Sequence, residues 1–181
     1  MAKANLTVNR EDGTIIFDRA QIPYGNWRNF SGGPTRFNKS NTQRFFEIFL
    51  TDEEGQRLKD LGWNVKWLES KNESEPSQAH MKVFVKLDGP ARLKPKLWMT
   101  RTKGNPILMD EDLVSQLDSD DIVRAKLMIR PYDWELDNGT SGRKAMLKQA
   151  YFTIEEDEFG AEFYSDEFEH EYNGDEEIPF A

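Results

Sequence analysis

Residues 81–87 read Met-Lys-Val-Phe-Val-Lys-Leu and decide the fold class, because apolar residues occupy every odd-numbered position. Successive side chains of a β-strand point to opposite faces of a sheet, so the odd-numbered residues form one continuous apolar face. A strand with one apolar and one mixed face is typical of a sheet that packs against a core on one side only. The stretch therefore predicts a core strand of a β protein.

Short β-rich segments recur along the chain on both sides of this strand. Between them lie strong turn signals, such as Asp12-Gly13, Gly32-Gly33-Pro34 and Asn138-Gly139. Several short strands at this spacing predict a mainly β fold, either a barrel or a sandwich. Besides 81–87, the predicted strands cover residues 14–17, 45–50, 65–68, 96–101, 123–130 and 147–154.

Two short helices interrupt the strands. Residues 51–54, Thr-Asp-Glu-Glu, have the spacing of a capping box, in which the Thr51 hydroxyl and the Glu54 carboxylate each accept a hydrogen bond from the other residue's backbone N–H. Gly62 suits the left-handed position just after a helix end, so we predict a helix over about residues 52–61. A second, shorter helix is predicted to begin at Asp110.

Charge is distributed unevenly along the chain. The whole sequence carries 24 Lys+Arg and 33 Asp+Glu, a net charge of −9. Residues 155–181 hold 12 of those acids and no Lys or Arg, which leaves residues 1–154 with 21 acids, 24 bases and a net charge of +3. We therefore predict one domain over residues 1–154 and a disordered acidic tail over residues 155–181, whose acids repel one another. A charge asymmetry of this kind points to nucleic acid as a partner.

The composition excludes most enzyme chemistry. The chain has no cysteine and only two histidines, and it contains no phosphate-binding, dinucleotide-binding or H-E-x-x-H motif. The acids between Asp110 and Asp121 could suggest a two-metal nuclease site, but their places at a helix start and before a strand favour capping and turns. We expect a protein that is not an enzyme and that needs no metal or cofactor.

The outward faces of two predicted strands are basic, and one of them is also aromatic. In residues 81–87 the outward side chains are Lys82, Phe84 and Lys86. Folding gives little reason for a solvent-facing Phe between two lysines, whereas unpaired bases stack on such rings at roughly 1–3 kcal/mol each while ammonium groups meet phosphates. The alternative interpretation is a solvated face that only keeps the sheet soluble. Residues 123–130 repeat the basic pattern, with Arg124, Lys126 and Arg130 outward and Val123, Ala125, Leu127 and Ile129 inward.

Aromatic and basic residues are also interleaved in the predicted loop 27–39. A flexible loop of this composition can clamp bases while its charges follow the phosphate backbone. The alternative is that Trp27 and Phe30 plug one end of a barrel. The candidate DNA-binding residues of the loop are Trp27, Arg28, Phe30, Arg36, Phe37 and Lys39, with Arg44 just beyond it. A similar group is formed by Trp98, Arg101 and Lys103.

The last seven residues, Asp-Glu-Glu-Ile-Pro-Phe-Ala, resemble the C-terminal tip of bacterial single-stranded DNA-binding proteins. In that family the tip docks into basic pockets of replication and repair enzymes, where apolar residues anchor it and acids steer it. The resemblance implies that the tail recruits protein partners, although family tips end on the Phe and here Ala181 follows it. The partner-binding residues would be Asp175, Glu176, Glu177, Ile178, Pro179 and Phe180.

The body resembles the single-stranded DNA-binding proteins of tailed bacteriophages over roughly residues 14–154. The segments that carry this likeness are 29–32 (Asn-Phe-Ser-Gly), 44–46 (Arg-Phe-Phe), 62–66 (Gly-Trp-Asn-Val-Lys), 131–134 (Pro-Tyr-Asp-Trp) and 142–147 (Gly-Arg-Lys-Ala-Met-Leu). The resemblance implies an OB-fold, a small Greek-key barrel that binds oligonucleotides on one face. It also implies a protein that coats exposed strands, without sequence preference, during phage DNA replication, recombination and repair.

Two other functions stay open on the sequence alone. An RNA-binding OB module would use the same stacking contacts, because stacking tolerates either sugar. An acidic DNA mimic that inhibits a host protein would use the acidic tail, although the basic outward faces disfavour it. No apolar run reaches the roughly 18 residues of a membrane span, so we expect a soluble cytoplasmic protein, in the host cell if the chain is phage-encoded, without a membrane partner.

Overall fold

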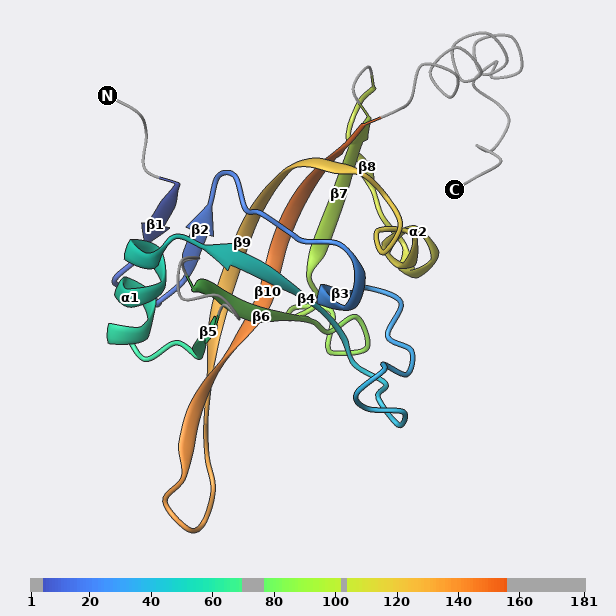
Figure 1. Cartoon of the computed structure of the whole chain (residues 1–181). Helices are drawn as coiled ribbons and strands as arrows, with labels where there is room; N and C mark the ends of the chain where they lie inside the picture. The colour runs from blue at the N-terminus through green and yellow to red at the C-terminus, as the bar shows by residue number, and fades with distance from the viewer. Residues whose placement is uncertain (1–4, 70–76, 102–103, 156–181) are drawn as a thin grey trace, which may run out of the picture.

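The computed structural model describes residues 5–69, 77–101 and 104–155. Within them the chain forms a mainly β domain with two short α-helices, as the sequence predicted (Figure 1). Lys103 and the predicted tail from residue 156 onward lie outside the described residues. The strands are β1 (Leu6–Val8), β2 (Ile15–Phe17), β3 (Arg28–Asn29), β4 (Arg44–Leu50), β5 (Val65–Leu68), β6 (Gln78–Val85), β7 (Lys96–Arg101), β8 (Ile107–Leu108), β9 (Ile122–Glu135) and β10 (Ser141–Ile154). The helices are α1 (Asp52–Asp60) and α2 (Glu111–Gln116), with a 3₁₀ turn at Gly25–Trp27.

Five strands form an OB-like barrel. Hydrogen-bonded neighbours run in the order β2, β9, β10, β6 and β4, and every pair in this order is antiparallel except β6 with β10. The segment after β2 links the two ends of this order. The Ala20 N–H donates to the Ala125 carbonyl of β9, and the Phe49 N–H of β4 donates to the Gln21 carbonyl. This arrangement is the Greek-key barrel that the resemblance implied.

The core lies inside the barrel and consists of alternating residues of each strand. In β6 the odd-numbered residues are buried, as the alternation predicted. In β9 three of the four residues predicted to face inward are buried, but Val123 is 51% exposed, so that part of the prediction is wrong. Its neighbours Ile122 and Arg124 pair with consecutive residues of β10. Val123 is therefore an extra residue in a β-bulge, which shifts the alternation by one.

Both helices begin at the caps that the sequence predicted. The Thr51 hydroxyl accepts from the Glu54 N–H at 3.1 Å, and the Glu54 carboxylate accepts from the Thr51 N–H at 2.9 Å. Gly62, with φ of +98°, follows the end of α1. The Asp110 carboxylate accepts from the Leu113 N–H at the start of α2. No helix among the described residues is long and apolar enough to cross a membrane.

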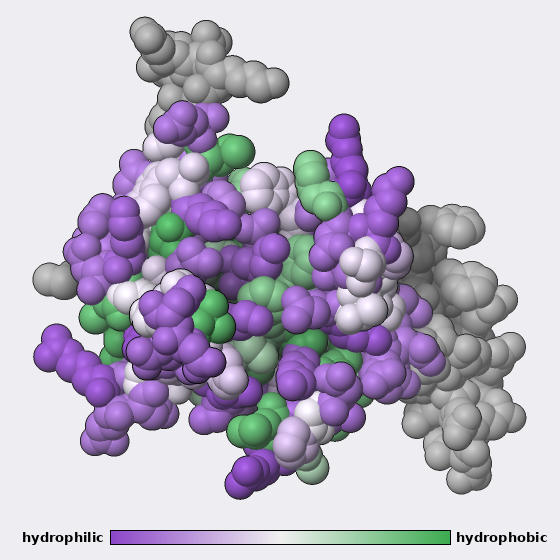
Figure 2. All heavy atoms as spheres, turned by 90° about the horizontal axis from the view of Figure 1, so that it is seen from below, coloured by the Kyte–Doolittle hydropathy of each residue, from purple (hydrophilic) through white to green (hydrophobic). Residues whose placement is uncertain are grey.

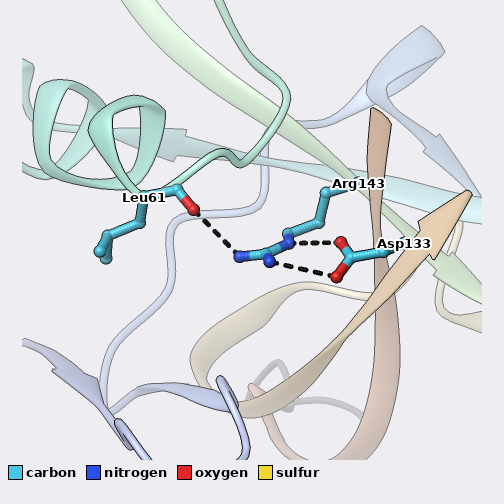
Figure 3. Close-up of polar contacts among 3 residues, drawn as sticks. All are labelled: Leu61, Asp133 and Arg143. Atoms are coloured by element: carbon cyan, nitrogen blue, oxygen red, sulfur yellow. Dashed lines mark hydrogen bonds and ion pairs between the residues drawn. The ribbon is translucent and has the colours of Figure 1, made fainter. Parts of the chain in front are cut away.

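Strands β9 and β10 continue beyond the barrel as a long hairpin, which points downward in Figure 1. The sequence placed the end of one strand at residue 130, before Pro131, and the start of the other at residue 147. Pro131 is tolerated in β9 because β2 pairs only as far as Ile129, so the strand lacks a second described neighbour at the proline. Arg143 holds the hairpin in place, since its guanidinium binds both carboxylate oxygens of Asp133, at 2.6 and 3.2 Å, and donates to the Leu61 carbonyl at the end of α1 (Figure 3).

Candidate nucleic-acid interface

The outward face of β6 and its neighbours combines aromatic rings with lysines. Phe84 is half-buried and Lys82 is exposed, which agrees with the predicted outward direction of both. The ring of Phe45, on β4 directly opposite Phe84, lies edge-on to it at 6.5 Å between centroids. The Lys82 ammonium lies 4.4 Å from the Phe45 centroid, and the Lys144 ammonium lies 4.9 Å from the Phe84 centroid. Each ring on this face therefore has a cation beside it.

A groove of about 650 Å³ runs past Phe84. Strand register creates it, because Met146 of β10 pairs with Phe84 of β6 on one side and with Arg130 of β9 on the other. The loop that follows β6 forms the opposite wall. Four cations and two carboxylates line the groove, so its net charge is +2. The charged lining residues are Arg44, Lys86, Arg130 and Lys144, with Asp88 and Glu111; the main apolar and aromatic ones are Phe84, Leu93, Tyr132 and Met146.

The loop between β3 and β4 reaches one end of the groove through Thr42 and Gln43. Asparagine side chains brace it, since the Asn41 amide donates to the Gly33 and Gln43 carbonyls at 2.9 Å. The loop exposes Phe37, of which 83% is accessible to solvent, and the Arg36 guanidinium lies 5.9 Å from the centre of that ring. Lys39, also on this loop, is exposed.

Arg44 occupies the junction between this loop and the groove. Its Nη1 atom donates to the Phe30 carbonyl at 2.6 Å and to the Ser115 hydroxyl at 3.1 Å. Part of the guanidinium is thus committed to holding the loop against α2, while the side chain still lines the groove.

Two residues predicted to contact DNA lie in the interior, which corrects the prediction. Phe30 is fully buried, stacked on Phe46 with 4.9 Å between ring centroids. Arg28 is 6% exposed, and its guanidinium donates to four backbone carbonyl oxygens. Trp27 is half-buried, with its ring edge-on to those of Phe49 and His80. Phe30 therefore has a packing role, in line with the alternative interpretation, as a member of the hydrophobic core.

The acids that could have suggested a nuclease serve the fold. The Asp118 carboxylate accepts from the Phe30 and Ser31 N–H groups at 2.6 and 3.2 Å. The Tyr24 hydroxyl donates to the Asp121 carboxylate, and this hydrogen bond raises the pKa of Tyr24. Burial raises the pKa of the Asp120 carboxyl. Together with Asp110 at the start of α2, these contacts confirm the capping and turn interpretation.

The remaining candidates gather at the other end of β9 and β10, away from the groove. Trp98 of β7 stacks on Tyr151 of β10. On β9, Lys126 is paired with Tyr151 and Arg124 with Thr153. Arg101 ends β7 and is half-buried, near Asp120. Lys103 lies outside the described residues. Apart from the buried residues, the predicted residues thus form two groups, one at the groove and its adjoining loop and one at this end of β9 and β10.

Four residues of these groups escaped the sequence analysis. Phe45 lies at the start of the predicted strand 45–50 and is only 8% exposed. Tyr132 and Lys144 lie beyond the predicted strand ends, and Tyr151 was hidden by the bulge at Lys148, which breaks the alternation of β10. Tyr132 and Lys144 fall within the segments that resemble phage proteins, which was the available signal.

The surface seen from below, on the side of the hairpin, is largely hydrophilic (Figure 2). Hydrophobic residues appear there in small areas separated by hydrophilic ones.

Solved structures of phage single-stranded DNA-binding proteins are similar to this chain. A single-stranded DNA-binding protein from bacteriophage Enc34, in complex with ssDNA, aligns with a TM-score of 0.52 at 10% identity, over 88% of this chain and 97% of that chain, so the two share a fold. Another structure of the single-stranded DNA-binding protein from bacteriophage Enc34 aligns with a TM-score of 0.47 at 11% identity, over 92% of this chain and 97% of that chain. The TM-score for gp2.5, a single-stranded DNA-binding protein encoded by bacteriophage T7, is 0.35 at 11% identity, over 81% of this chain and 96% of that chain.

Among curated protein sequences, none matches this chain. The family described as "Putative phage ssDNA-binding domain" matches residues 10–173, which include the whole barrel. This is a family of DNA-binding domains and not of enzymes, as the sequence analysis expected. Because the match covers most of its 181 residues, the chain belongs to this family of phage single-stranded DNA-binding domains.

Proposed function

We propose that the domain over residues 1–154 binds single-stranded DNA along the groove beside Phe84, without sequence preference, and coats exposed strands during phage DNA replication, recombination and repair. The observation that carries this proposal is the row formed by Phe84, Met146 and Arg130 across three adjacent strands, with Lys144 and Lys86 beside it. Ring faces and cations recognise features that every nucleotide has, which suits binding that is independent of sequence.

The contact between Lys144 and Phe84 suggests how a base enters. The ammonium lies over the ring, where a stacking base would lie. An exposed cation–π contact is worth about 0.5–1 kcal/mol, whereas a stacked base contributes about 1–3 kcal/mol. Exchange of the ammonium for a base is therefore favourable, and it frees the Lys144 charge to meet the phosphate of the same nucleotide.

The acidic segment over residues 155–181 is proposed to recruit replication or repair proteins, on the evidence of its sequence. Acids before Ile178 and Phe180 would steer the segment to a basic rim, and the two apolar side chains would anchor it. A protein with both parts would cover a strand and deliver enzymes to it.

Equilibrium binding to labelled oligo-dT, the matching RNA and duplex DNA tests the main proposal. We expect the tightest binding to oligo-dT, with Phe84→Ala weaker by about 1–3 kcal/mol and the unfolding temperature nearly unchanged, because the ring is only half-buried. Preference for RNA would favour the RNA-binding alternative. Failure of the parent protein to bind any of the three would refute the proposal.

A pair of lysine variants tests the groove itself. Lys86→Ala removes a cation that lines the groove, whereas Lys59→Ala removes an exposed one from α1. Each phosphate contact adds about 0.7 to the salt dependence of single-strand binding on logarithmic axes. We expect the slope to fall by about that amount in Lys86→Ala and to stay unchanged in Lys59→Ala. Equal salt-dependence slopes in Lys86→Ala and Lys59→Ala would show that the DNA strand binds outside the groove.

A further inference from the structure

We infer that Trp98 and Tyr151 form a second base-stacking site, which takes unpaired nucleotides of the same strand after they leave the groove. This inference rests on the proposed function and adds the path of the DNA: the DNA strand runs along β9 and β10 rather than only across β6. The site would lengthen the stretch of DNA that one chain covers.

The two rings form a rigid platform on the outside of the barrel. Trp98 of β7 and Tyr151 of β10 are register partners, and their rings stack with 6.1 Å between centroids and 9° between planes. Tyr151 is 41% exposed, and its hydroxyl oxygen accepts a hydrogen bond from the Gln149 amide at 3.0 Å. A ring that is fixed by a stacking partner and a hydrogen bond loses little conformational entropy when a base stacks on it.

Folding alone does not explain the tryptophan. The Trp98 Nε1 atom is buried and has no hydrogen-bond partner among the described residues. A buried donor left unpaired costs about 1–3 kcal/mol, so a phenylalanine at this position would serve packing better. The larger π surface of the indole is an advantage for stacking.

Cations surround this platform on both sides. Lys126 of β9 is directly opposite Tyr151, and Arg124 is opposite Thr153. On the other side, Lys96 of β7 is opposite Gln149. All three basic side chains are exposed, although the Lys126 ammonium lies 3.8 Å from an Asp18 carboxylate oxygen. A ring platform with two cations on one side and one on the other is complementary to the bases and phosphates of a single strand.

The groove and the platform lie on the same outward side of β10, at different positions along the strand. Met146 in the groove and Tyr151 both point outward from β10, and the strand between them has one extra residue at the bulge. At about 3.3 Å per residue the separation is about 13–17 Å. Stacked nucleotides rise about 3.4 Å each and unstacked ones rise further, so at most about five nucleotides bridge the two sites.

Binding of two lengths of oligo-dT to the full chain tests the inference. About 4 nucleotides fill the groove only, whereas about 12 reach the platform, and both lengths lie within the range of known OB-fold sites. We expect Tyr151→Ala to weaken binding of the long oligonucleotide by about 5- to 150-fold and to leave the short one unchanged. Tyr151→Phe keeps the ring but loses the hydrogen bond from Gln149, so it should weaken binding of the long oligonucleotide much less than Tyr151→Ala does. Phe84→Ala should weaken both.

The other outcomes distinguish a failure of this inference from a failure of the proposed function. Equal long-oligonucleotide affinity of Tyr151→Ala and the parent, with Phe84→Ala still weakened, overturns the platform but keeps the groove. Weakening of both lengths by Tyr151→Ala overturns the separation of the two sites. Absence of binding by the parent overturns the proposed function itself.

Photo-crosslinking of the parent protein gives a test that does not depend on the folding of variants. Oligo-dT carrying one 5-iodouracil at successive positions is irradiated, and the crosslinked residues are identified by mass spectrometry. We expect one set of positions to crosslink near Phe84 and another, up to about five nucleotides away, to crosslink at Trp98 or Tyr151. Crosslinks that never reach these two residues would overturn the inference.

Discussion

Replacing Arg28 tests whether this arginine stabilises the fold or binds DNA, because the sequence favoured DNA binding and the structure buries it. Its guanidinium donates to the carbonyl oxygens of Pro23 at 3.0 Å, Leu117 at 3.1 Å, Asp120 at 2.7 Å and Ile22 at 2.9 Å. The side chain thus ties the turn before β3 to the segment after α2. Burial lowers the pKa of the guanidinium, although an arginine stays protonated at neutral pH.

The cost of losing this side chain follows from those four contacts. A hydrogen bond to a charged group contributes about 1.5–3 kcal/mol net, so four of them sum to about 6–12 kcal/mol. Withdrawing the guanidinium from water costs several kcal/mol, which Arg28→Ala would recover. We therefore expect a loss of about 3–5 kcal/mol, near the upper end for single substitutions. For a chain of this length the unfolding temperature should fall by about 6–20 °C.

Urea unfolding followed by tryptophan fluorescence measures the stability, and oligo-dT binding under conditions where the variant is folded measures the affinity. Arg36→Ala is the matched control, because Arg36 lies exposed on the same loop region. We expect Arg28→Ala to lose stability and keep its affinity, and Arg36→Ala to keep its stability. The reasoning is refuted if Arg28→Ala is as stable as the parent and binds DNA more weakly.

Three further perturbations probe other parts of the molecule. Gly55→Ala should lower the free energy of unfolding by about 1–3 kcal/mol, because the new Cβ would lie 2.9 Å from the Ala79 Cβ, and this overpacking exceeds the gain of about 1 kcal/mol in helix propensity. The double variant with Ala79→Gly should recover stability, and a Gly55→Ala variant as stable as the parent would contradict this packing. The Arg143 hydrogen bond lowers the pKa of Asp133, so the parent should be more stable than Asp133→Asn above about pH 4 and lose this advantage as the pH falls through the pKa of Asp133 in the folded protein. Urea unfolding measures both stabilities, and a difference that persists at lower pH would contradict the role of the Asp133 carboxylate. Removal of residues 155–181, with a charge of −12, should raise the affinity for oligo-dT, most at low salt, if the segment competes for the groove; unchanged affinity would limit it to other roles.

Local patterns predicted the parts of the fold in which the sequence repeats at the period of its structure. Alternation placed the inward and outward faces of β6 correctly, and with them the direction of Phe84. The Thr51–Glu54 spacing predicted the start of α1, because a capping box involves only four consecutive residues. Strands β1, β3 and β8 were missed, since two or three residues are too few to show an alternation.

Local patterns could not divide the loop residues into buried and exposed ones. Arg28 and Arg36 stand in one run of interleaved bases and aromatics, and nothing local distinguishes them. Two of the carbonyl groups that fix Arg28 come from residues 89 and 92 positions further along the chain. Only the tertiary arrangement brings them together, so the sequence could not show that Arg28 is buried while Arg36 of the same run is exposed.

The use of acids in the fold explains how a domain with a net charge of only +3 presents a cationic face. The Asp118 carboxylate accepts from two backbone N–H groups, and the Glu54 carboxylate accepts from the Thr51 N–H and from the Asn5 amide. Carboxylates held by N–H donors in this way are not placed to neutralise lysines on the outward face. Lys82 and Lys144 lie over aromatic rings instead, and neither forms an ion pair within the part of the chain that the structure describes. A ring attracts a cation without cancelling its charge, so Lys82 and Lys144 both keep their positive charge, and the half-buried Phe84 also keeps a surface on which a base could stack, whereas Phe45 is buried. The separation of acids into caps and turns, and of bases onto rings, therefore creates a cationic and aromatic face that the net charge conceals, and the proposed DNA binding uses this face.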